Sequence, residues 1–226
     1  MHIILFDIDG TLLHSGGAGQ GGIERALKLA FGITAPTDGI PTAGRTDRGI
    51  GRDLIRFHGL EQTDATFTLL QETYLRVLPE ELATRQGGVY PGVRELLDRL
   101  SRREDVRLGL LTGNYREAAW QKLRHYGLAE HFAFGGFGDD HADRDDVARQ
   151  ALQAAAECHS PQIIDREKLW VIGDTLADVR CGRAIGARVI AVATGMYSIE
   201  ELKPSDPDHL FADFADVESV LKLWSK

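Results

Sequence analysis

The sequence predicts an α/β protein in which a doubly wound, Rossmann-like parallel sheet forms the middle of three layers. Two observations carry this prediction. Over residues 90–226, short apolar runs alternate with apolar residues at helical spacing, which is typical of a parallel sheet covered by helices on both faces. Residues 14–89 instead form an all-helical unit with apolar stripes of its own. We therefore expect a core of residues 1–13 and 90–226 and a separate helical domain of residues 14–89.

The chain begins with a buried strand at residues 2–6, which ends at Asp7–Gly10. A glycine-rich stretch, residues 15–22, leads into the helical unit. Apolar side chains at helical spacing predict three helices in that unit. Their stripes begin at Ile23, Ile50 and Phe67. Gly87 and Gly88 mark a second linker, back to the core.

After residue 90, helices and strands alternate to the end of the chain. Helices are expected near Pro91 and at residues 115–126, 145–157, 176–185 and 217–224. Strands are expected at residues 106–111, 132–134, 169–172 and 189–192. In a doubly wound sheet the ligand site lies beyond the carboxyl ends of the strands, so the residues that follow each strand are the first candidates for function.

The composition limits the class of partner. The chain has 226 residues with 26 Lys+Arg and 34 Asp+Glu, so the formal net charge is −8. This balance argues against a surface built to bind nucleic acid or anionic lipid, because both need a positive field. No apolar run reaches the roughly 18 residues of a membrane span, and the N-terminus does not read as a signal peptide. Cys158 and Cys181 form no close-spaced motif, so we expect free thiols and a cytoplasmic protein.

Two carboxylates follow the first strand directly. Asp7 and Asp9 are separated by one residue, so in an extended chain their side chains point to the same side. Two converging carboxylates repel each other unless a cation or a proton lies between them. The plain alternative is a solvated turn, since Asp and Gly favour turns. The residues that follow the other strands decide between these two interpretations.

Polar residues also follow two later strands. One strand ends in Thr112 and Gly113, which offer a hydroxyl and a backbone N–H that a ligand can approach closely. Another is followed by Asp174, with Asp178 four residues later on the same face of a predicted helix. Singly, these residues are explained as helix caps or as acids at a helix N-terminus. Together, carboxylates gathered at one sheet edge indicate a site for a hard cation, most naturally Mg²⁺.

These motifs resemble those of the haloacid dehalogenase-like (HAD) hydrolase superfamily, and the resemblance spans nearly the whole chain. Phe6 to Leu12, with the sequence FDIDGTL, is similar to the first motif of the family. Residues 111–114 (LTGN) are similar to its second motif, and residues 173–178 (GDTLAD) to its fourth. The implied fold is a Rossmann-like core with a helical cap inserted after the first motif, as in phosphoglycolate phosphatase-like members.

The resemblance assigns roles to the matching residues. It implies that Asp7 is the nucleophile and that Asp9 is the general acid and base. It also implies that the Thr112 hydroxyl and the Gly113 N–H bind phosphoryl oxygens. Each of these residues lies at the predicted carboxyl edge of the sheet, where the reacting group would have to bind.

The same resemblance implies Mg²⁺ as the cofactor. The ion would be held by Asp7, by the backbone carbonyl of Asp9 and by Asp174. Asp178 would be a ligand through water, or a residue that orients the others. The sequence does not decide between these two roles for Asp178.

At the third motif, which usually supplies a lysine, the sequence departs from the family pattern. Between the second and fourth motifs the lysines are Lys122, in the middle of a predicted helix, and Lys168, too close to Asp174. We therefore predict that Arg144, at a loop-to-helix junction, takes this role. An arginine supplies a fixed positive charge and a fork of donors for phosphoryl oxygens. The plain alternative is a surface arginine that offsets the neighbouring aspartates.

Residues 14–89 resemble the helical cap that covers the site in this superfamily, and closing such a cap excludes water and selects the substrate. The proposed hinge consists of the glycines at positions 16, 17, 19, 21 and 22. Gly44 to Asp47 (GRTD) resembles the specificity loop of phosphoglycolate phosphatase-like members. We expect Arg45 to meet a carboxylate or a second anionic group, with Arg48 or Arg52 as alternatives. A solvated charged loop is the plain alternative.

The resemblance implies a Mg²⁺-dependent phosphatase that acts on a small cytosolic phosphate ester through an aspartyl phosphate on Asp7. Asp9 favours phosphoryl transfer, because the resemblance implies that halide-displacing members lack this second aspartate. A phosphomutase or nucleotidase with the same site is an alternative. A metal-binding regulatory or interaction module without turnover is an alternative of another class. The expected partner is a small phosphorylated metabolite, not nucleic acid or a membrane, and the sequence identifies no protein partner.

Overall fold

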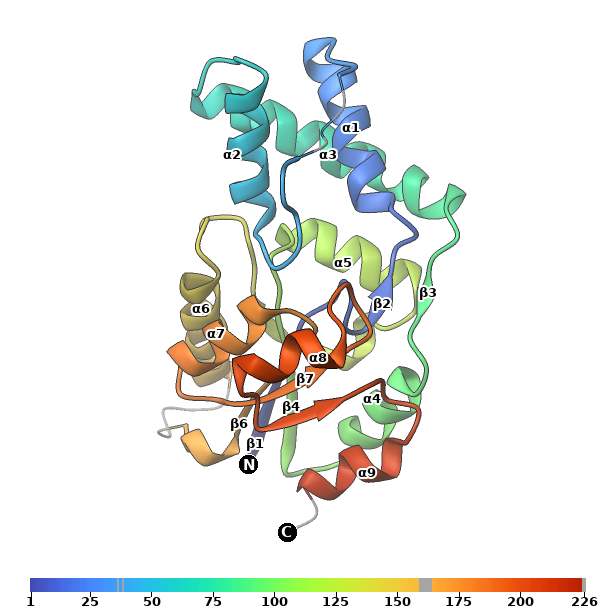
Figure 1. The fold of residues 1–226 in the computed structure, drawn as a ribbon, viewed down its shortest axis with the longest axis vertical. Coiled ribbons are helices and arrows are strands. Elements are labelled where there is room, and N and C mark those ends of the chain that lie inside the picture. Colours follow the sequence, from blue (N-terminus) through green and yellow to red (C-terminus); the bar gives the residue numbers. More distant parts are fainter. Residues whose placement is uncertain (36, 38, 159–163, 225–226) are drawn as a thin grey trace.

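A parallel β-sheet forms the centre of the molecule (Figure 1). The computed structural model describes residues 1–35, 37, 39–158 and 164–224. The six strands lie in the order β5-β4-β1-β6-β7-β8, and each neighbouring pair is parallel. Their bounds are β1 His2–Phe6, β4 Val106–Leu111, β5 Phe134–Gly136, β6 Leu169–Gly173, β7 Arg188–Val192 and β8 His209–Phe211. The predicted α/β class is confirmed.

The strand order places β1 in the middle, between β4 and β6. Phe6 pairs with Leu110 of β4 on one side and with Ile172 of β6 on the other. The Asp7 N–H then donates to the carbonyl of Ile172 at 2.9 Å, which extends the ladder by one residue. Because the three strands end at the same level, the residues that follow them meet at one edge of the sheet.

Helices cover both faces of the sheet, as a doubly wound fold requires. One face packs against α4 Val93–Ser101, α5 Arg116–His125 and α9 Val217–Leu221. The other face packs against α6 Arg144–Cys158 and α7 Leu176–Ala184. The short helix α8 Ile199–Leu202 contributes Leu202 to a small cluster with β7. Four 3₁₀ turns complete the described helices: Ala129–His131, Arg166–Lys168, Lys203–Ser205 and Lys222–Trp224.

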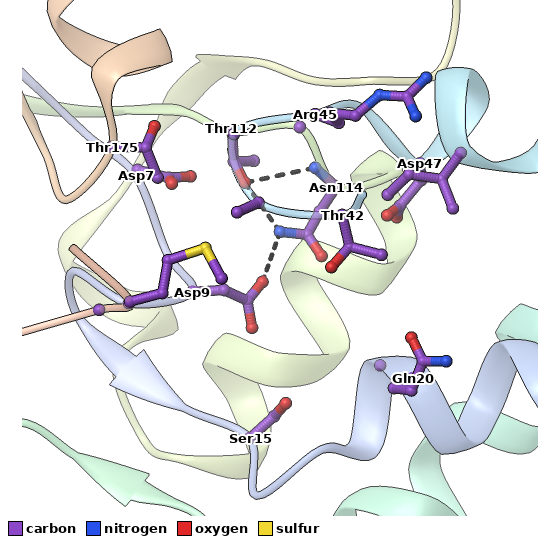
Figure 2. Close-up of a pocket in the computed structure, with 18 of the residues that line it drawn as sticks. Asp7, Asp9, Ser15, Gln20, Thr42, Arg45, Asp47, Thr112, Asn114 and Thr175 are labelled. Atoms are coloured by element: carbon purple, nitrogen blue, oxygen red, sulfur yellow. Dashed lines mark hydrogen bonds between the residues drawn. The ribbon is translucent and has the colours of Figure 1, made fainter. Parts of the chain in front are cut away.

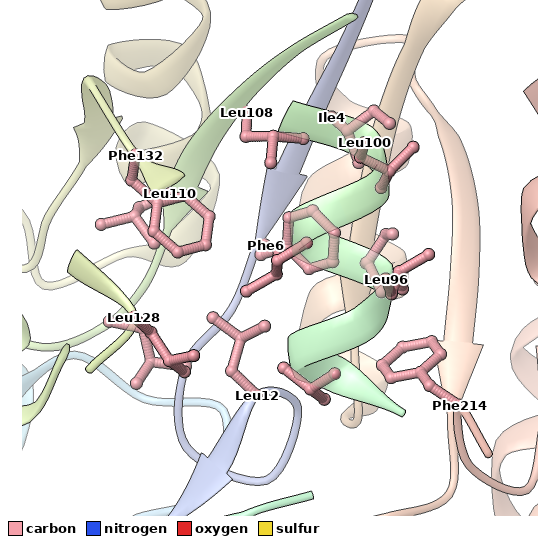
Figure 3. Packing of buried hydrophobic residues seen from close by; sticks show 14 of the residues in the cluster. Ile4, Phe6, Leu12, Leu96, Leu100, Leu108, Leu110, Leu128, Phe132 and Phe214 are labelled. Carbon is pink, nitrogen blue, oxygen red and sulfur yellow. The ribbon is translucent and has the colours of Figure 1, made fainter. Parts of the chain in front are cut away.

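The alternation of side chains along β1 explains the two layers of helices. Ile4 and Phe6 point into the cluster shared with α4 and α9 (Figure 3). Ile3 and Leu5 point into the cluster shared with α6 and α7. All four side chains are buried, and burying a side chain of this size contributes about 1.5–3 kcal/mol. A strand that is apolar on both faces is therefore held in the centre of the sheet.

Three helices form a separate group above the carboxyl edge of the sheet (Figure 1). They are α1 Ala18–Phe31, α2 Asp47–Phe57 and α3 Asp64–Thr84. They share a core that includes Leu27, Leu54, Tyr74 and Leu78. The short antiparallel strands β2 Leu13–His14 and β3 Gly88–Val89 lie where the chain enters and leaves this group. The division into two domains stays a prediction, and the three expected helices are present.

The glycine-rich stretch before α1 is not a continuous linker, so the predicted five-glycine hinge is wrong in part. Gly19, Gly21 and Gly22 lie inside α1. A Cβ on Gly22 would meet the Tyr74 ring at 3.0 Å, so this glycine allows α1 and α3 to approach closely. Of the five glycines, only Gly16 and Gly17 adopt the left-handed conformation that favours glycine, with φ angles of 61° and 84°.

Two strand predictions need correction. The strand expected at residues 132–134 lies at Phe134–Gly136, because Phe132 packs into the core before the ladder begins. Gly136 belongs to the strand, and a Cβ there would lie 2.2 Å from the Val147 carbonyl of α6. The edge strand β8 was not predicted at all. It is three residues long and half-buried throughout, so it lacks an alternating pattern.

Both cysteines are free thiols, as predicted: Cys158 is exposed and Cys181 is buried. Burial raises the pKa of the Cys181 thiol to about 12, so it stays protonated. Within the described residues, no helix combines the length and apolarity that crossing a bilayer requires.

Candidate active site

The carboxyl ends of β1, β4 and β6 open into a cavity of about 320 Å³, roofed by α1, α2 and α3 (Figure 2). Most of the predicted site residues line it: Asp7, Asp9, Arg45, Thr112, Gly113, Arg144 and Asp174. Asp178 is fully buried next to the cavity. The structure therefore brings together residues that are as much as 171 positions apart in the chain, from Asp7 to Asp178.

Asp7 and Arg144 form a buried ion pair. Arg144 is the first residue of α6, and its Nη2 lies 2.9 Å from Asp7 Oδ2 and 2.5 Å from Asp178 Oδ1. The Arg144 side chain is 4% exposed, which rules out a solvated surface arginine. Burial raises the pKa of Asp7, and the Arg144 charge partly opposes that rise. One guanidinium thus links Asp7, which follows β1, with Asp178 in α7, the helix that follows β6.

Asp174 is the second carboxylate at this edge. Thr11 Oγ1 donates to its Oδ1 at 2.9 Å. Two glycines enclose its other oxygen: a Cβ on Gly10 or Gly195 would lie 2.3 Å or 1.8 Å from Oδ2. Burial raises the pKa of Asp174, and the nearby carboxylates of Asp178 and Asp7 raise it further. Without a bound metal ion in addition to Arg144, the site therefore cannot readily hold all its carboxylates in the charged form.

A divalent cation fits this donor set. Oxygen atoms of Asp7, Asp174 and Asp178 all lie within 4.8 Å of one another, and all three residues are buried. Carboxylate oxygens at this density are the ligands that Mg²⁺ prefers. The glycine backbone around Asp174 Oδ2 leaves no room for a side chain, and Asp174 lines the cavity.

Asp178 already uses both of its oxygens. Its Oδ2 accepts hydrogen bonds from the Thr175 N–H at 3.0 Å and from Thr175 Oγ1 at 2.7 Å, while Oδ1 pairs with Arg144. With Thr175 it forms the capping box of α7, which satisfies donors at the helix start. Of the two roles left open by the sequence, this geometry favours the residue that orients Arg144.

Asp9 faces the same cavity and carries its own partners. Its Oδ2 accepts hydrogen bonds from Lys122 Nζ at 2.6 Å and from Asn114 Nδ2 at 2.8 Å, and Figure 2 shows the second of these. Its side chain is 40% exposed, in contrast to 7% for Asp7. The two carboxylates after β1 are therefore paired with different cations. Both line the cavity, and Asp9 is the more exposed of the two.

Lys122 lines the cavity, although sequence reasoning set it aside for the third-motif role because it lies in the middle of a helix. It lies on α5, and its Nζ also donates to Asn114 Oδ1 at 2.7 Å. Its side chain is only 4% exposed. A signal was present in the sequence: Lys122 shares the buried face of α5 with Ala118, Ala119 and Leu123, and a lysine on such a face needs a buried partner.

Thr112 and Gly113 sit where β4 ends. Thr112 is fully buried, and its Oγ1 accepts from the backbone and side-chain nitrogens of Asn114 at 3.3 Å and 2.8 Å. Gly113 must be a glycine, because a Cβ there would lie 2.0 Å from the carbonyl of Arg45. The loop that begins α2 therefore rests directly on the end of the strand.

Arg45 lines the cavity, but its guanidinium is engaged elsewhere. Nη2 lies 2.6 Å from Asp53 Oδ2, and Nη1 donates to the carbonyl of Pro41 at 3.2 Å. In Figure 2 the guanidinium points away from Asp7 and Asp9. The two alternatives do not line the cavity: Arg48 donates to the carbonyl of Asp139 at 3.1 Å, and Arg52 is exposed.

Asp47, two residues after Arg45, is a second residue to which the sequence gave no role. It is the first residue of α2, and it lines the cavity. Its Oδ2 accepts from the Tyr115 N–H at 2.8 Å, and its own N–H donates to the Gly113 carbonyl at 2.7 Å. Burial raises the pKa of Asp47 to about 6. Asp47 is thus fixed to the core by two hydrogen bonds while its carboxylate borders the cavity.

Comparison with known proteins decides the family. The family described as haloacid dehalogenase-like hydrolase matches residues 1–186. The chain belongs to the haloacid dehalogenase-like hydrolases. A phosphoglycolate phosphatase from Rhodospirillum rubrum is 31% identical to this hydrolase over 226 residues, which cover 95% of this chain and 88% of the relative. A 5′-nucleotidase from Pseudomonas aeruginosa is 25% identical and covers 97% and 95% of the two chains.

A solved structure shows that the fold of this HAD-like hydrolase is shared. The crystal structure of CbbY from Rhodobacter sphaeroides in complex with phosphate matches it with a TM-score of 0.75. The sequences are 19% identical, and the match covers 96% of each chain. At this identity the likeness concerns the fold alone.

The cavity of this HAD-like hydrolase can hold a nucleophile, an acid and an anion together. Asp7 is the inner carboxylate and Asp9 the outer one, so their environments differ although they lie two residues apart. Arg144 and Lys122 bring two positive charges to the same edge. Positive charges that are already in place stabilise an anionic transition state without reorganising.

Proposed function

We propose that this phosphatase hydrolyses a small phosphate monoester with the help of Mg²⁺ and through a phosphoaspartate on Asp7. The observation that carries the proposal is the pair Asp7 and Asp9 at the edge of one cavity. The inner carboxylate is held by Arg144, and the outer one is held by Lys122 and Asn114. This arrangement supports Asp7 as the nucleophile and Asp9 as the proton donor toward the same bound phosphoryl group.

Asp7, Asp174 and the backbone carbonyl of Asp9 would hold the ion. When bound, Mg²⁺ offsets the negative charge of the phosphoryl group, which otherwise repels a carboxylate nucleophile. Arg144 adds a second positive charge next to Asp7. The Thr112 hydroxyl and the Gly113 N–H would bind phosphoryl oxygens, and both residues line the cavity.

The reaction then has two steps. A carboxylate oxygen of Asp7 forms a bond to phosphorus while the ester oxygen leaves with its electron pair, and the Asp9 carboxyl gives its proton to that oxygen. Asp9 next takes a proton from water, the water oxygen bonds to phosphorus, and the Asp7–phosphorus bond breaks. Inorganic phosphate leaves, and both carboxyl groups return to their starting state. A single hard displacement is thereby divided into two easier ones.

Phosphoglycolate is the substrate that one relative's name suggests. Arg45, which the sequence predicted would meet the carboxylate of such a substrate, is paired with Asp53. Another relative is named a 5′-nucleotidase, so nucleotidase and phosphomutase chemistry in the same cavity remain the alternatives. A binding module without turnover is the alternative of another class. The two free cysteines support the predicted cytoplasmic location, because a reducing compartment keeps thiols unpaired.

The test is phosphate release from p-nitrophenyl phosphate and from a panel of small phosphate esters, with Mg²⁺ and with EDTA. We expect metal-dependent turnover that Asp7→Asn abolishes. Asp64→Asn, an exposed aspartate on α3 outside the cavity, is the matched control and should keep full activity. If the wild-type protein binds Mg²⁺ and turns over none of the esters, the phosphatase proposal fails and the binding module gains weight.

A further inference from the structure

The helical group contributes two charged side chains to the lining of the cavity, Arg45 and Asp47. The other cavity residues from this group include Gln20, Thr42 and Tyr74, which are polar but uncharged, and the apolar Ile23 and Ile50. Because the core supplies the phosphoryl end of the site, the helical group faces the rest of the substrate. Its two charges therefore decide which leaving group the cavity accepts.

The positive charge of Arg45 is already paired with a carboxylate. Its guanidinium lies 2.6 Å from one oxygen of Asp53, whose other oxygen pairs with Arg56, and these pairings hold the pKa of the Asp53 carboxyl below its usual range. The same guanidinium donates to the Pro41 carbonyl. A substrate carboxylate would have to displace Asp53 before it could bind Arg45.

The negative charge of Asp47 is not neutralised by an ion pair. Within the described part of the chain, no cation lies within 4.0 Å of its carboxylate. The Lys122 charge acts on Asp47 from a distance and partly opposes the rise in its pKa, but the Lys122 ammonium donates to Asp9 and Asn114 instead. Asp47 Oδ2 accepts from the Tyr115 N–H, and no hydrogen bond to Oδ1 is formed among the described residues. The helical side of the cavity thus presents an anionic acceptor.

From this arrangement we propose that the substrate's leaving group carries no negative charge and donates a hydroxyl or amino hydrogen to the Asp47 carboxylate. This inference rests on the proposed phosphatase activity and narrows its substrate class. A carboxylate in the leaving group would face Asp47 in a partly buried site, where like charges repel more strongly than in water. A hydroxyl would supply the donor that the carboxylate lacks.

The size of the cavity is compatible with a short polar chain. Its volume is about 320 Å³, at the lower end of the roughly 300–1,000 Å³ that is typical of small-molecule pockets. That space holds a phosphoryl group together with a few carbon atoms and their hydroxyls. Ile23 and Ile50 line the same wall, so carbon atoms between the hydroxyls would find apolar contacts.

The test uses pairs of phosphate esters that differ only by CH₂OH in place of COO⁻. The pairs are 2-hydroxyethyl phosphate with phosphoglycolate, glycerol 3-phosphate with 3-phosphoglycerate, and glucitol 6-phosphate with 6-phosphogluconate. In the pair with the highest activity, we expect kcat/KM for the hydroxyl ester to exceed that of the acid by at least about tenfold. The acid being hydrolysed as well as the hydroxyl ester, or better, would overturn the inference.

The role of Asp47 is tested with Asp47→Asn, which keeps the shape of the side chain and removes its charge. We expect the ratio within the pair to fall toward one, chiefly through a lower KM for the acid. Glu61→Gln is the matched control, since it removes an exposed charge of the same helical group outside the cavity, and it should keep the wild-type ratio. An unchanged ratio in a folded Asp47→Asn protein would overturn the assignment.

Two outcomes separate this inference from the activity beneath it. The ratio in the wild-type protein tests the inference even if Asp47→Asn does not fold. Hydrolysis of p-nitrophenyl phosphate together with a preference for the acid overturns the inference and leaves the phosphatase intact. If no ester is hydrolysed, including p-nitrophenyl phosphate, the proposed function fails and this inference fails with it.

Discussion

Arg144 joins two buried carboxylates through one guanidinium nitrogen. Nη2 pairs with Asp7 and with Asp178, and removing it would leave both carboxylates without their cation. We expect Arg144→Ala to lower the free energy of unfolding by about 3–5 kcal/mol and to abolish turnover. Chemical denaturation and phosphate release measure the two effects. Arg149→Ala breaks an exposed pair on the same helix. It should change the free energy of unfolding by no more than about 1 kcal/mol and leave turnover unchanged.

Arg144→Lys separates charge from geometry. A lysine keeps the charge but replaces the planar guanidinium with a single ammonium on a flexible chain, which need not sit where Nη2 meets both carboxylates. We expect this variant to recover part of the stability and little of the turnover. Full turnover in Arg144→Lys would show that only the charge matters, which contradicts the role proposed for the guanidinium.

Lys122 donates a hydrogen bond to the Asp9 carboxylate. Its Nζ and the Asn114 amide hold one oxygen of Asp9, and they thereby orient the other oxygen, to which no described side chain donates a hydrogen bond. We expect Lys122→Met to lower kcat by about 10–100-fold, since small displacements of a catalytic group have effects of this size. Steady-state kinetics on the best ester should show KM changing much less than kcat.

Two comparisons make the Lys122 experiment decisive. Lys28→Met removes an exposed lysine from α1 and should leave kcat unchanged. Lys122→Arg keeps a cation near Asp9 and should recover part of the rate. If Lys122→Met shows wild-type kcat, the lysine serves packing alone and the orienting role is wrong.

At the scale of elements, the contact between the strand end and the helical group depends on Gly113. A Cβ at this position would lie 2.0 Å from the Arg45 carbonyl and 3.1 Å from Thr46 Cα. We expect Gly113→Ala to push the loop before α2 away from β4, which weakens substrate binding and raises KM by about tenfold or more. Gly51→Ala is the control, because a Cβ inside α2 there would make only ordinary contacts, 3.5 Å or longer.

The loop before α2 also carries the hydrogen bonds that Gly113→Ala would disturb. The Asp47 N–H donates to the Gly113 carbonyl, and Asp47 Oδ2 accepts from the Tyr115 N–H. A Gly113→Ala protein with wild-type KM for the best ester would mean that the loop relaxes without losing its hold on the cavity. In that case the strand end and the helical group are less tightly coupled than the distances indicate.

At the scale of elements, the sequence predicts the helices and strands but not the partners of the charged side chains between them. The helices and long strands were predictable because apolar spacing encodes them, and the carboxylates after β1 and β6 were predictable because they follow such strands. The partners of Lys122 and Arg45 were not, because they depend on which side chains the fold brings together. Lys122 meets Asp9 across 113 positions of the chain. Arg45 meets Asp53 inside α2, the helix that follows it directly. No local sequence pattern predicts either pairing.

On the scale of the whole molecule, the strand order explains why one edge of the sheet carries so much charge. Parallel strands direct all their carboxyl ends to the same side, and β1 lies between the two strands whose following residues complete the site. The apolar residues of β1, β4 and β6 below this edge are buried, and the charged groups above it are held by ion pairs or hydrogen bonds. The apolar residues that stabilise the core therefore lie along the strands, and the charged groups that repel one another lie beyond the strand ends.

That strain makes the stability of the whole molecule depend on pH and on Mg²⁺. Burial and neighbouring carboxylates raise the pKa of Asp174, and burial raises that of Asp7. A carboxyl whose pKa is higher in the folded state binds more protons there than in the unfolded chain, so stability falls as the pH rises above the unfolded pKa of about 4. In EDTA we expect the Tm to decrease between about pH 5 and about pH 8.

Mg²⁺ should reverse this decrease, because it binds the ionised carboxylates of the folded state and not the unfolded chain. Thermal unfolding with Mg²⁺ and with EDTA at several pH values measures the effect, and the gain in Tm from Mg²⁺ should grow with pH. Asp174→Asn removes one carboxyl whose pKa is raised. The Tm of this variant in EDTA should therefore depend less on pH, and adding Mg²⁺ should raise its Tm less than in the wild type. A Tm in EDTA that rises across this range would mean that Asp7 and Asp174 are stabilised in the charged form, and the cation site argued from their crowding would be wrong.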